Sequence, residues 1–308
     1  MNSIIKKLPV PIVGLMLALA ALGNLVLSYG KTYRNILGLI SAIILLLVLV
    51  KIIKYTDDVK ENLKNPVVAS VFPTLSMGIM LLSAYLPSKS LGLIIWLIGL
   101  GIHIGLIIWF SIKYLLNFNI KKVFPSWFIV YVGIAVASVT ATNYNKTSIG
   151  QICFWFGFIS YLILMPIVLY RVFRVKEIPE AAMPTLVILS APASLCLAGY
   201  MNSFQEKSMA IVWLLLILSQ LTLCLVLFKL PGLLKLKFYP SYSAFTFPLV
   251  ISGISLKLTN GFLTNAGNII PFFQYLIKFE EIIAIAMVLY VLFRYINFIF
   301  SNKESIKA

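Results

Sequence analysis

The sequence predicts an all-α integral membrane protein with ten transmembrane helices. Of its 308 residues, 61% are hydrophobic and 11% are charged, and the mean hydropathy is +1.02. Soluble domains contain about 45–50% apolar and about 25% charged residues, so this chain carries too few charges to cover a water-exposed surface. Apolar runs long enough to cross a bilayer also recur along its whole length.

Ten stretches are long enough to be spans, because a helix needs about 20 mostly apolar residues to cross the hydrocarbon core. They comprise roughly residues 10–28, 36–54, 67–86, 91–114, 126–143, 149–170, 182–201, 208–230, 240–260 and 278–300. The loops between them are short and leave no room for a soluble domain. Residues 1–308 are therefore predicted to form a single ten-helix transmembrane domain.

The basic residues predict how the chain is oriented. Lys and Arg gather in cytoplasmic loops, and with a cytoplasmic N-terminus 18 of the 25 Lys and Arg residues fall on that side. The net charge of +16 then divides into +12 inside and +4 outside. We interpret it as a topology signal that also suits contact with anionic lipid, and not as a sign of nucleic-acid binding. The protein is predicted to lie in the cell (plasma or inner) membrane with both termini cytoplasmic.

Two kinds of span alternate along the chain. The even-numbered spans are nearly pure Leu, Ile, Val and Phe, which suits helices that face lipid on most sides. The odd-numbered spans carry Ala, Gly, Ser and Thr, which allow helices to approach closely. Prolines also fall in or near the odd spans, at Pro11, Pro73, Pro125, Pro192 and Pro248. This pattern predicts five helical hairpins with the odd helices inside and the even helices outside.

The prolines and hydroxyl groups of the odd spans point to a central pore. Proline removes a backbone hydrogen bond and kinks a helix, which membranes tolerate where water, hydroxyls or neighbouring helices satisfy the freed carbonyl. The alternative is that small residues and prolines only mark tight packing. Hydroxyls in membrane helices also bond to their own helix, so about half of the candidates are expected to face the pore. The candidates are Thr74, Ser76, Ser138, Thr140, Ser194, Ser243, Thr246 and Ser252.

Five segments of the odd spans occur in an order and spacing that resemble the tellurite-resistance/dicarboxylate transporter family. That family includes the bacterial protein TehA, fungal malic-acid permeases and the slow-type anion channels of plant guard cells. The segments are P-x-P at Pro9 to Pro11 with Gly14 and LALAALGNL, NPVVASVFPTLSMGIMLL with Pro73, PSWFIVYVGIAVAS from Pro125, APASLCLAGY with Pro192, and SAFTFPLVISGIS with Phe245 and Phe247.

The resemblance implies a homotrimer in which each protomer has its own pore inside five hairpins. It also implies that a phenylalanine on the ninth span plugs the pore, and the second aromatic of the A-F-x-F motif places that gate at Phe247. Pro73, Pro125 and Pro192 match family prolines that shape the inner helices. Pro248 departs from TehA, which has glycine there, and a proline beside the plug would stiffen the turn or change the resting rotamer.

The function that we predict is an anion channel or facilitator for small anions: halide, nitrate, C4-dicarboxylate or an oxyanion such as tellurite. No Asp, Glu, Arg or Lys lies near the centre of an odd span, whereas ion-coupled carriers usually keep an intramembrane charge. The alternative is a coupled exporter of the ten-helix drug/metabolite type, which is built from two five-helix repeats. The chain has no convincing repeat of that kind.

We expect no enzyme activity, cofactor or metal site. The sequence has no acid/base pair, nucleophile constellation or cluster of His, Cys, Asp and Glu. The single histidine, His103, lies in the fourth span, where packing is favoured over a pH sensor. Glu280 and Glu281, with Lys278, are expected to form a solvated rim at the outer start of the tenth span.

Overall fold

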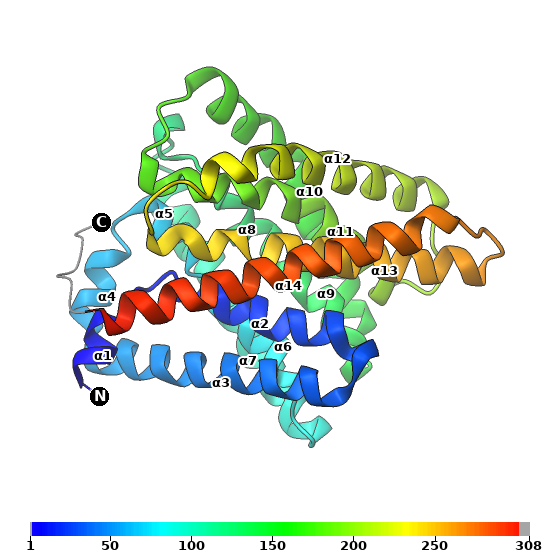
Figure 1. Ribbon diagram of the computed structural model, residues 1–308, viewed down its shortest axis with the longest axis horizontal. Helices are drawn as coiled ribbons and strands as arrows, with labels where there is room; N and C mark the ends of the chain where they lie inside the picture. The colour runs from blue at the N-terminus through cyan, green and yellow to red at the C-terminus, as the bar shows by residue number, and fades with distance from the viewer. Residues whose placement is uncertain (1, 302–308) are drawn as a thin grey trace.

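Long helices running side by side make up the computed structural model, which describes residues 2–301 (Figure 1). Within that range there is no strand, and nine helical stretches are long and apolar enough to cross a membrane. The predicted all-helical membrane fold is therefore confirmed. The predicted ninth span is not among those nine stretches. Lys303, Glu304 and Lys307, counted above on the cytoplasmic side, lie outside the described residues.

The odd-numbered spans form what we call the five inner segments, and most consist of more than one helical piece. In chain order they are α2 (Ile12–Leu25) with η1 (Val26–Tyr29); α5 (Pro66–Val71) with α6 (Thr74–Ser83); α8 (Trp127–Tyr131), η4 (Val132–Ile134), α9 (Ala135–Thr140) and η5 (Ala141–Tyr144); η7 (Glu180–Ser190) with α11 (Ala191–Ser203); and η8 (Pro240–Phe245) with α13 (Phe247–Asn265).

The even-numbered spans are long and mostly continuous. These outer helices are α3 (Lys31–Lys54), α7 (Lys89–Phe110) with η2 (Ser111–Leu115), α10 (Thr147–Tyr170) with η6 (Arg171–Val175), α12 (Met209–Leu233) and α14 (Pro271–Phe300). Three short helices lie outside both sets: α1 (Asn2–Lys7), α4 (Thr56–Asn62) and η3 (Ile120–Lys122).

Burial separates the two sets sharply. In the four inner segments that are long and apolar enough to cross a membrane, 72–78% of an apolar 18-residue stretch is buried, against 28–39% in the outer helices. The fifth inner helix, α13, is not among these four, but it is buried along most of its first half. Small side chains allow this close packing, whereas the bulky aliphatic side chains of the outer helices suit lipid. The predicted alternation of inner and outer helices is confirmed.

The inner segments contact one another in a closed ring. Around it, α2 touches α6, α6 touches α9, α9 touches α11, α11 touches α13, and α13 returns to α2. Each outer helix packs against the inner segment that precedes it in the chain and against the next segment around the ring. The ring is therefore sealed on its outside by helices that cover its five seams.

Interruptions of the inner segments coincide mainly with prolines. Pro73 separates α5 from α6, while Pro192 and Pro248 occupy the second positions of α11 and α13. Proline has no N–H to donate, so it suits the first turn of a helix and ends the one before it. The fifth span differs, because its break is the η4 turn around Gly133, which contains no proline.

The expectation of a solvated rim at Glu280 and Glu281 was wrong. Helix α14 begins at Pro271, seven residues before the predicted start, so both carboxylates lie well inside the helix. They are 4% and 3% exposed. Glu281 pairs with Lys257 Nζ at 2.7 Å, whereas Glu280 makes no hydrogen bond of standard geometry among the described residues.

Candidate functional site

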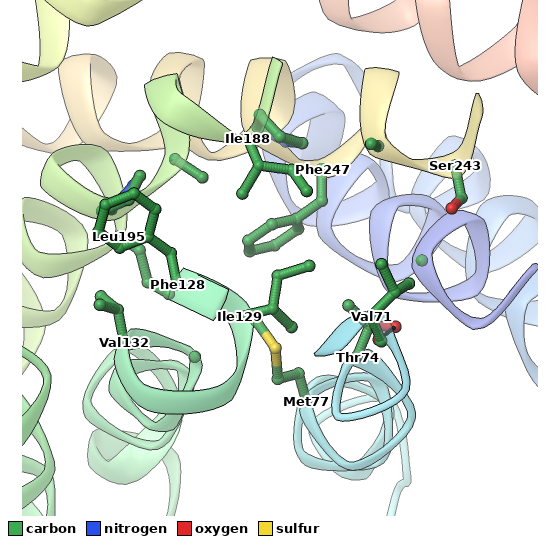
Figure 2. Close-up of a pocket in the computed structure, with 16 residues that line it drawn as sticks. Val71, Thr74, Met77, Phe128, Ile129, Val132, Ile188, Leu195, Ser243 and Phe247 are labelled. Carbon is green, nitrogen blue, oxygen red and sulfur yellow. Dashed lines mark hydrogen bonds between the residues drawn. The ribbon is translucent and has the colours of Figure 1, made fainter. Parts of the chain in front are cut away.

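A small cavity of about 40 Å³ lies where the inner segments are interrupted. All five segments contribute to its wall, so it lies inside the ring (Figure 2). The residues that line it are Gly14, Val71, Thr74, Met77, Phe128, Ile129, Val132, Gly133, Ile188, Ala191, Pro192, Leu195, Ser243, Ala244, Phe247 and Pro248. We call it the inner cavity.

The wall of the inner cavity is almost entirely apolar. Among residues 2–301, Thr74 and Ser243 are the polar side chains that line it, and no charged side chain does. The Thr74 hydroxyl donates to the Val71 carbonyl at 2.8 Å, which occupies its hydrogen. The Ser243 hydroxyl is buried and makes no hydrogen bond of standard geometry among the described residues, and the Tyr295 hydroxyl lies nearby. Ser243 therefore places a second hydroxyl on the wall of this cavity.

A larger cavity of about 490 Å³ lies toward the ends of the inner segments that are remote from the N-terminus. We call it the vestibule. It too is lined by all five inner segments, together with the first turn of α3. No carboxylate of the described residues lines it, and its polar side chains are Asn24, Lys31, Arg34, Asn35, Thr140, Asn143 and Asn202.

Phe247 and Leu195 line both cavities. Phe247 is the first residue of α13 and is 7% exposed. Figure 2 shows its ring in the middle of the inner cavity, with Leu195 to the left and Ile129 below in this view. The two cavities are thus adjacent inside the ring and share the side chains of Phe247 and Leu195.

Five further residues of the predicted site also line the inner cavity: Gly14, Thr74, Pro192, Ser243 and Pro248. Gly14 and Ser243 face each other across α2 and η8. A Cβ atom at position 14 would lie 3.0 Å from both Cβ and Oγ of Ser243. Glycine at this position therefore allows η8 to approach α2 closely.

Other predicted residues lie away from both cavities and bond to the scaffold. The Ser138 hydroxyl donates to the Gly150 carbonyl of α10, and the Thr246 hydroxyl donates to the Ser243 carbonyl at 2.6 Å. The Ser194 hydroxyl donates to the Ser190 carbonyl at 2.8 Å and lies 2.7 Å from the hydroxyl oxygen of Ser219 on α12. Pro73 and Pro125 precede α6 and α8.

Of the remaining hydroxyl candidates, one lines a cavity and two do not. Thr140 lines the vestibule, and its hydroxyl oxygen accepts from Trp96 Nε1 at 2.8 Å. Ser76 lies 2.8 Å from His103 Nδ1, and Ser252 is buried with no partner for its hydroxyl. Only some of the hydroxyls therefore reach a cavity.

The polar residues of the vestibule were not singled out from the sequence. Arg34 and Lys31 were counted only as charges that set the orientation. A usable signal was present, because Asn24, Asn143 and Asn202 each stand near the end of an odd span. Three amides at matching ends of inner helices are typical of a polar mouth.

A closed ring of interrupted helices, sealed by apolar helices and holding two successive cavities, defines a multi-pass membrane channel or transporter. The chain belongs to the SLAC1 family, described as voltage-dependent anion channels, whose family model matches residues 8–296. The predicted family resemblance is confirmed.

Two uncharacterized transporters of Methanocaldococcus jannaschii are also similar. One is 27% identical over 192 residues, which cover 57% of this chain and 56% of the relative. The other is 25% identical over 191 residues, covering 57% and 54%. The matched region thus spans about half the length of these relatives.

Proposed function

We propose that the protein conducts small anions passively along the axis of the ring, and that Phe247 closes this path at rest. The observation that carries the proposal is that Phe247 and Leu195 line both cavities. An anion that leaves its hydration shell without replacement hydrogen bonds meets a large free-energy barrier. An apolar constriction of this kind stops conduction until the side chains move.

The electrostatics of the vestibule favour anions over cations. Lys31 and Arg34 line it, and no carboxylate does. Cavities lined by one sign of charge concentrate ions of the opposite sign. Beyond this mouth, Ser243 supplies a hydroxyl in the largely apolar inner cavity. We propose halide, nitrate, C4-dicarboxylate or a tellurite-like oxyanion as substrates.

The absence of charge from the inner cavity supports passive conduction over coupled transport. Its lining residues include no Asp, Glu, Lys or Arg, whereas coupled carriers usually hold an ionisable residue on the substrate pathway. The coupled exporter of the drug/metabolite type remains the competing function that the experiment must separate.

We further propose that residues 1–308 form one transmembrane domain in the cell membrane, with both termini cytoplasmic. The distribution of Lys and Arg supports this orientation. The family resemblance supports a homotrimer in which each protomer conducts through its own ring.

Reconstitution in planar bilayers with unequal NaCl concentrations on the two sides tests the mechanism. We expect a current that reverses near the chloride equilibrium potential and persists when a protonophore removes any proton gradient. A flux that stops on addition of the protonophore would favour the coupled exporter instead.

A further inference from the structure

We propose that Arg34 and Asn24 form a binding site for small planar oxyanions, such as a carboxylate or nitrate, at the wall of the vestibule. The inference rests on the proposed function and adds a recognition step before the constriction at Phe247. The supporting observations are the hydrogen bond between the two side chains and the N–H groups that remain without a partner.

The guanidinium of Arg34 is fixed on three sides. Its Nε donates to Asn24 Oδ1 at 3.0 Å, and its Nη2 donates to the Ala84 carbonyl at 2.9 Å. The group also lies over the ring of Tyr85, 3.9 Å from the ring centroid. The Tyr85 hydroxyl in turn donates to the Ala20 carbonyl at 2.6 Å. A guanidinium held in this way loses little conformational freedom when it binds a ligand.

Most of the Arg34 donors remain available. A guanidinium has five N–H groups, and the two bonds above use two of them. The other three have no partner among residues 2–301, and Arg34 lines the vestibule. Two parallel N–H groups of a guanidinium match the two oxygens of a planar oxyanion. A spherical halide cannot use that geometry in the same way.

The bond from Arg34 also sets the orientation of the Asn24 amide. Because Asn24 Oδ1 accepts from Arg34 Nε, its Nδ2 group must point away from that nitrogen. Nδ2 has no partner among the described residues, and Asn24 lines the same cavity. The pair therefore leaves guanidinium N–H groups and the Asn24 amide N–H groups without partners among the described residues, on the wall of the same cavity.

The vestibule wall carries no negative charge within the part of the chain that the structure describes. It includes Lys31 and no carboxylate from that part. Glu281, at the same end of the ring, is paired with Lys257 at 2.7 Å and accepts from the Tyr29 hydroxyl at 2.6 Å. The first turn of α3 adds the positive end of a helix dipole. A volume of about 490 Å³ accommodates a small carboxylate together with water.

The decisive variant is Asn24→Asp. The new carboxylate keeps the hydrogen bond from Arg34 Nε, so the fold is retained, but it neutralises the guanidinium and removes the amide donor. We would measure ¹⁹F NMR line broadening of trifluoroacetate with the purified, detergent-solubilised protein at constant ionic strength. In the wild type we expect saturable broadening that acetate and nitrate displace at lower concentration than chloride.

The variants give matched comparisons for this assay. We expect binding at least about tenfold weaker in Asn24→Asp and Arg34→Gln, equivalent to a loss of about 1.4 kcal/mol. Lys89→Gln, which removes an exposed lysine at the start of α7 outside the vestibule wall, should bind as the wild type does. Equal binding by wild type and Asn24→Asp would overturn the proposal and leave Arg34 a purely structural residue.

Currents separate failure of this site from failure of the channel. With sodium acetate in planar bilayers, the concentration for half-maximal current should rise severalfold in Asn24→Asp when acetate enters from the vestibule side, and stay unchanged from the other side. Selective binding without any current would contradict the channel and leave the site standing. Current without selective binding would contradict the site alone.

Discussion

His103 Nδ1 on the outer helix α7 lies 2.8 Å from the hydroxyl oxygen of Ser76 on the inner helix α6. The other ring nitrogen, Nε2, donates to the Val130 carbonyl at 3.2 Å, just before the η4 turn. The Ser76 hydroxyl is also 2.8 Å from the Pro73 carbonyl. The fully buried imidazole thus connects the interruptions of the third and fifth spans.

Replacing His103 should therefore destabilise the packing at the interruptions of the third and fifth spans. In His103→Ala the Val130 carbonyl loses its donor in a buried site, and each unsatisfied buried polar group costs about 1–3 kcal/mol. We expect a clearly lower melting temperature in detergent for His103→Ala and a smaller loss for His103→Gln, whose amide can donate to the same carbonyl. An unchanged melting temperature in His103→Ala would contradict this bridging role. With His103→Gln we also expect transport to keep its pH profile.

Gly14→Ala tests the close approach of α2 and η8. The added Cβ would lie 3.0 Å from the Ser243 side chain, so Ser243 must shift into a cavity of only about 40 Å³. We expect a reduced anion current and a destabilisation of about 1–3 kcal/mol, as for other overpacked cores. Gly101→Ala is the matched control, because the added Cβ would meet no other part of the described structure within 4 Å, apart from the chain next to it in its own helix. Equal currents in the two variants would refute the importance of this contact.

The adjacent carboxylates of α14 should respond oppositely to amide replacement. Glu280 is buried near Ser252 and Gln220, but its carboxylate makes no hydrogen bond of standard geometry and no ion pair among the described residues. A buried charge without a partner is costly, so Glu280→Gln should keep or raise the thermal stability at pH 8. Glu281→Gln should lower it by about 1–2 kcal/mol, because it weakens the contacts to Lys257 and Tyr29. A larger loss in Glu280→Gln than in Glu281→Gln would show that Glu280 has a stabilising partner.

The separation into inner and outer helices was predictable because side-chain size decides which helices can pack closely. Ala18 and Ala20 of α2 are fully buried, whereas Leu39 and Leu46 of α3 are each 62% exposed. Composition alone distinguishes these helices, and in a membrane small residues mark the close contacts. The prolines likewise predicted most of the interruptions, because the missing N–H acts locally.

The rotation of each helix about its axis was not predictable from composition. Pro192 and Ser194 are two residues apart on α11, which turns them about 200° apart. Pro192 therefore lines the inner cavity, while Ser194 points toward Ser219 on α12. The Arg34–Asn24 pair was not predictable for a similar reason, because it forms only where a turn of the chain brings the end of α2 beside the start of α3.

The most direct test of the account is the anion current of Phe247→Ala in planar bilayers or oocytes, compared at equal protein amount. Phe245→Ala is the matched control, because Phe245 packs against Tyr242 at a ring distance of 4.8 Å and lines neither cavity. If Phe247 closes the path, its truncation should raise the current well above wild type and Phe245→Ala should not. A well-expressed Phe247→Ala protein with wild-type current would contradict the central claim.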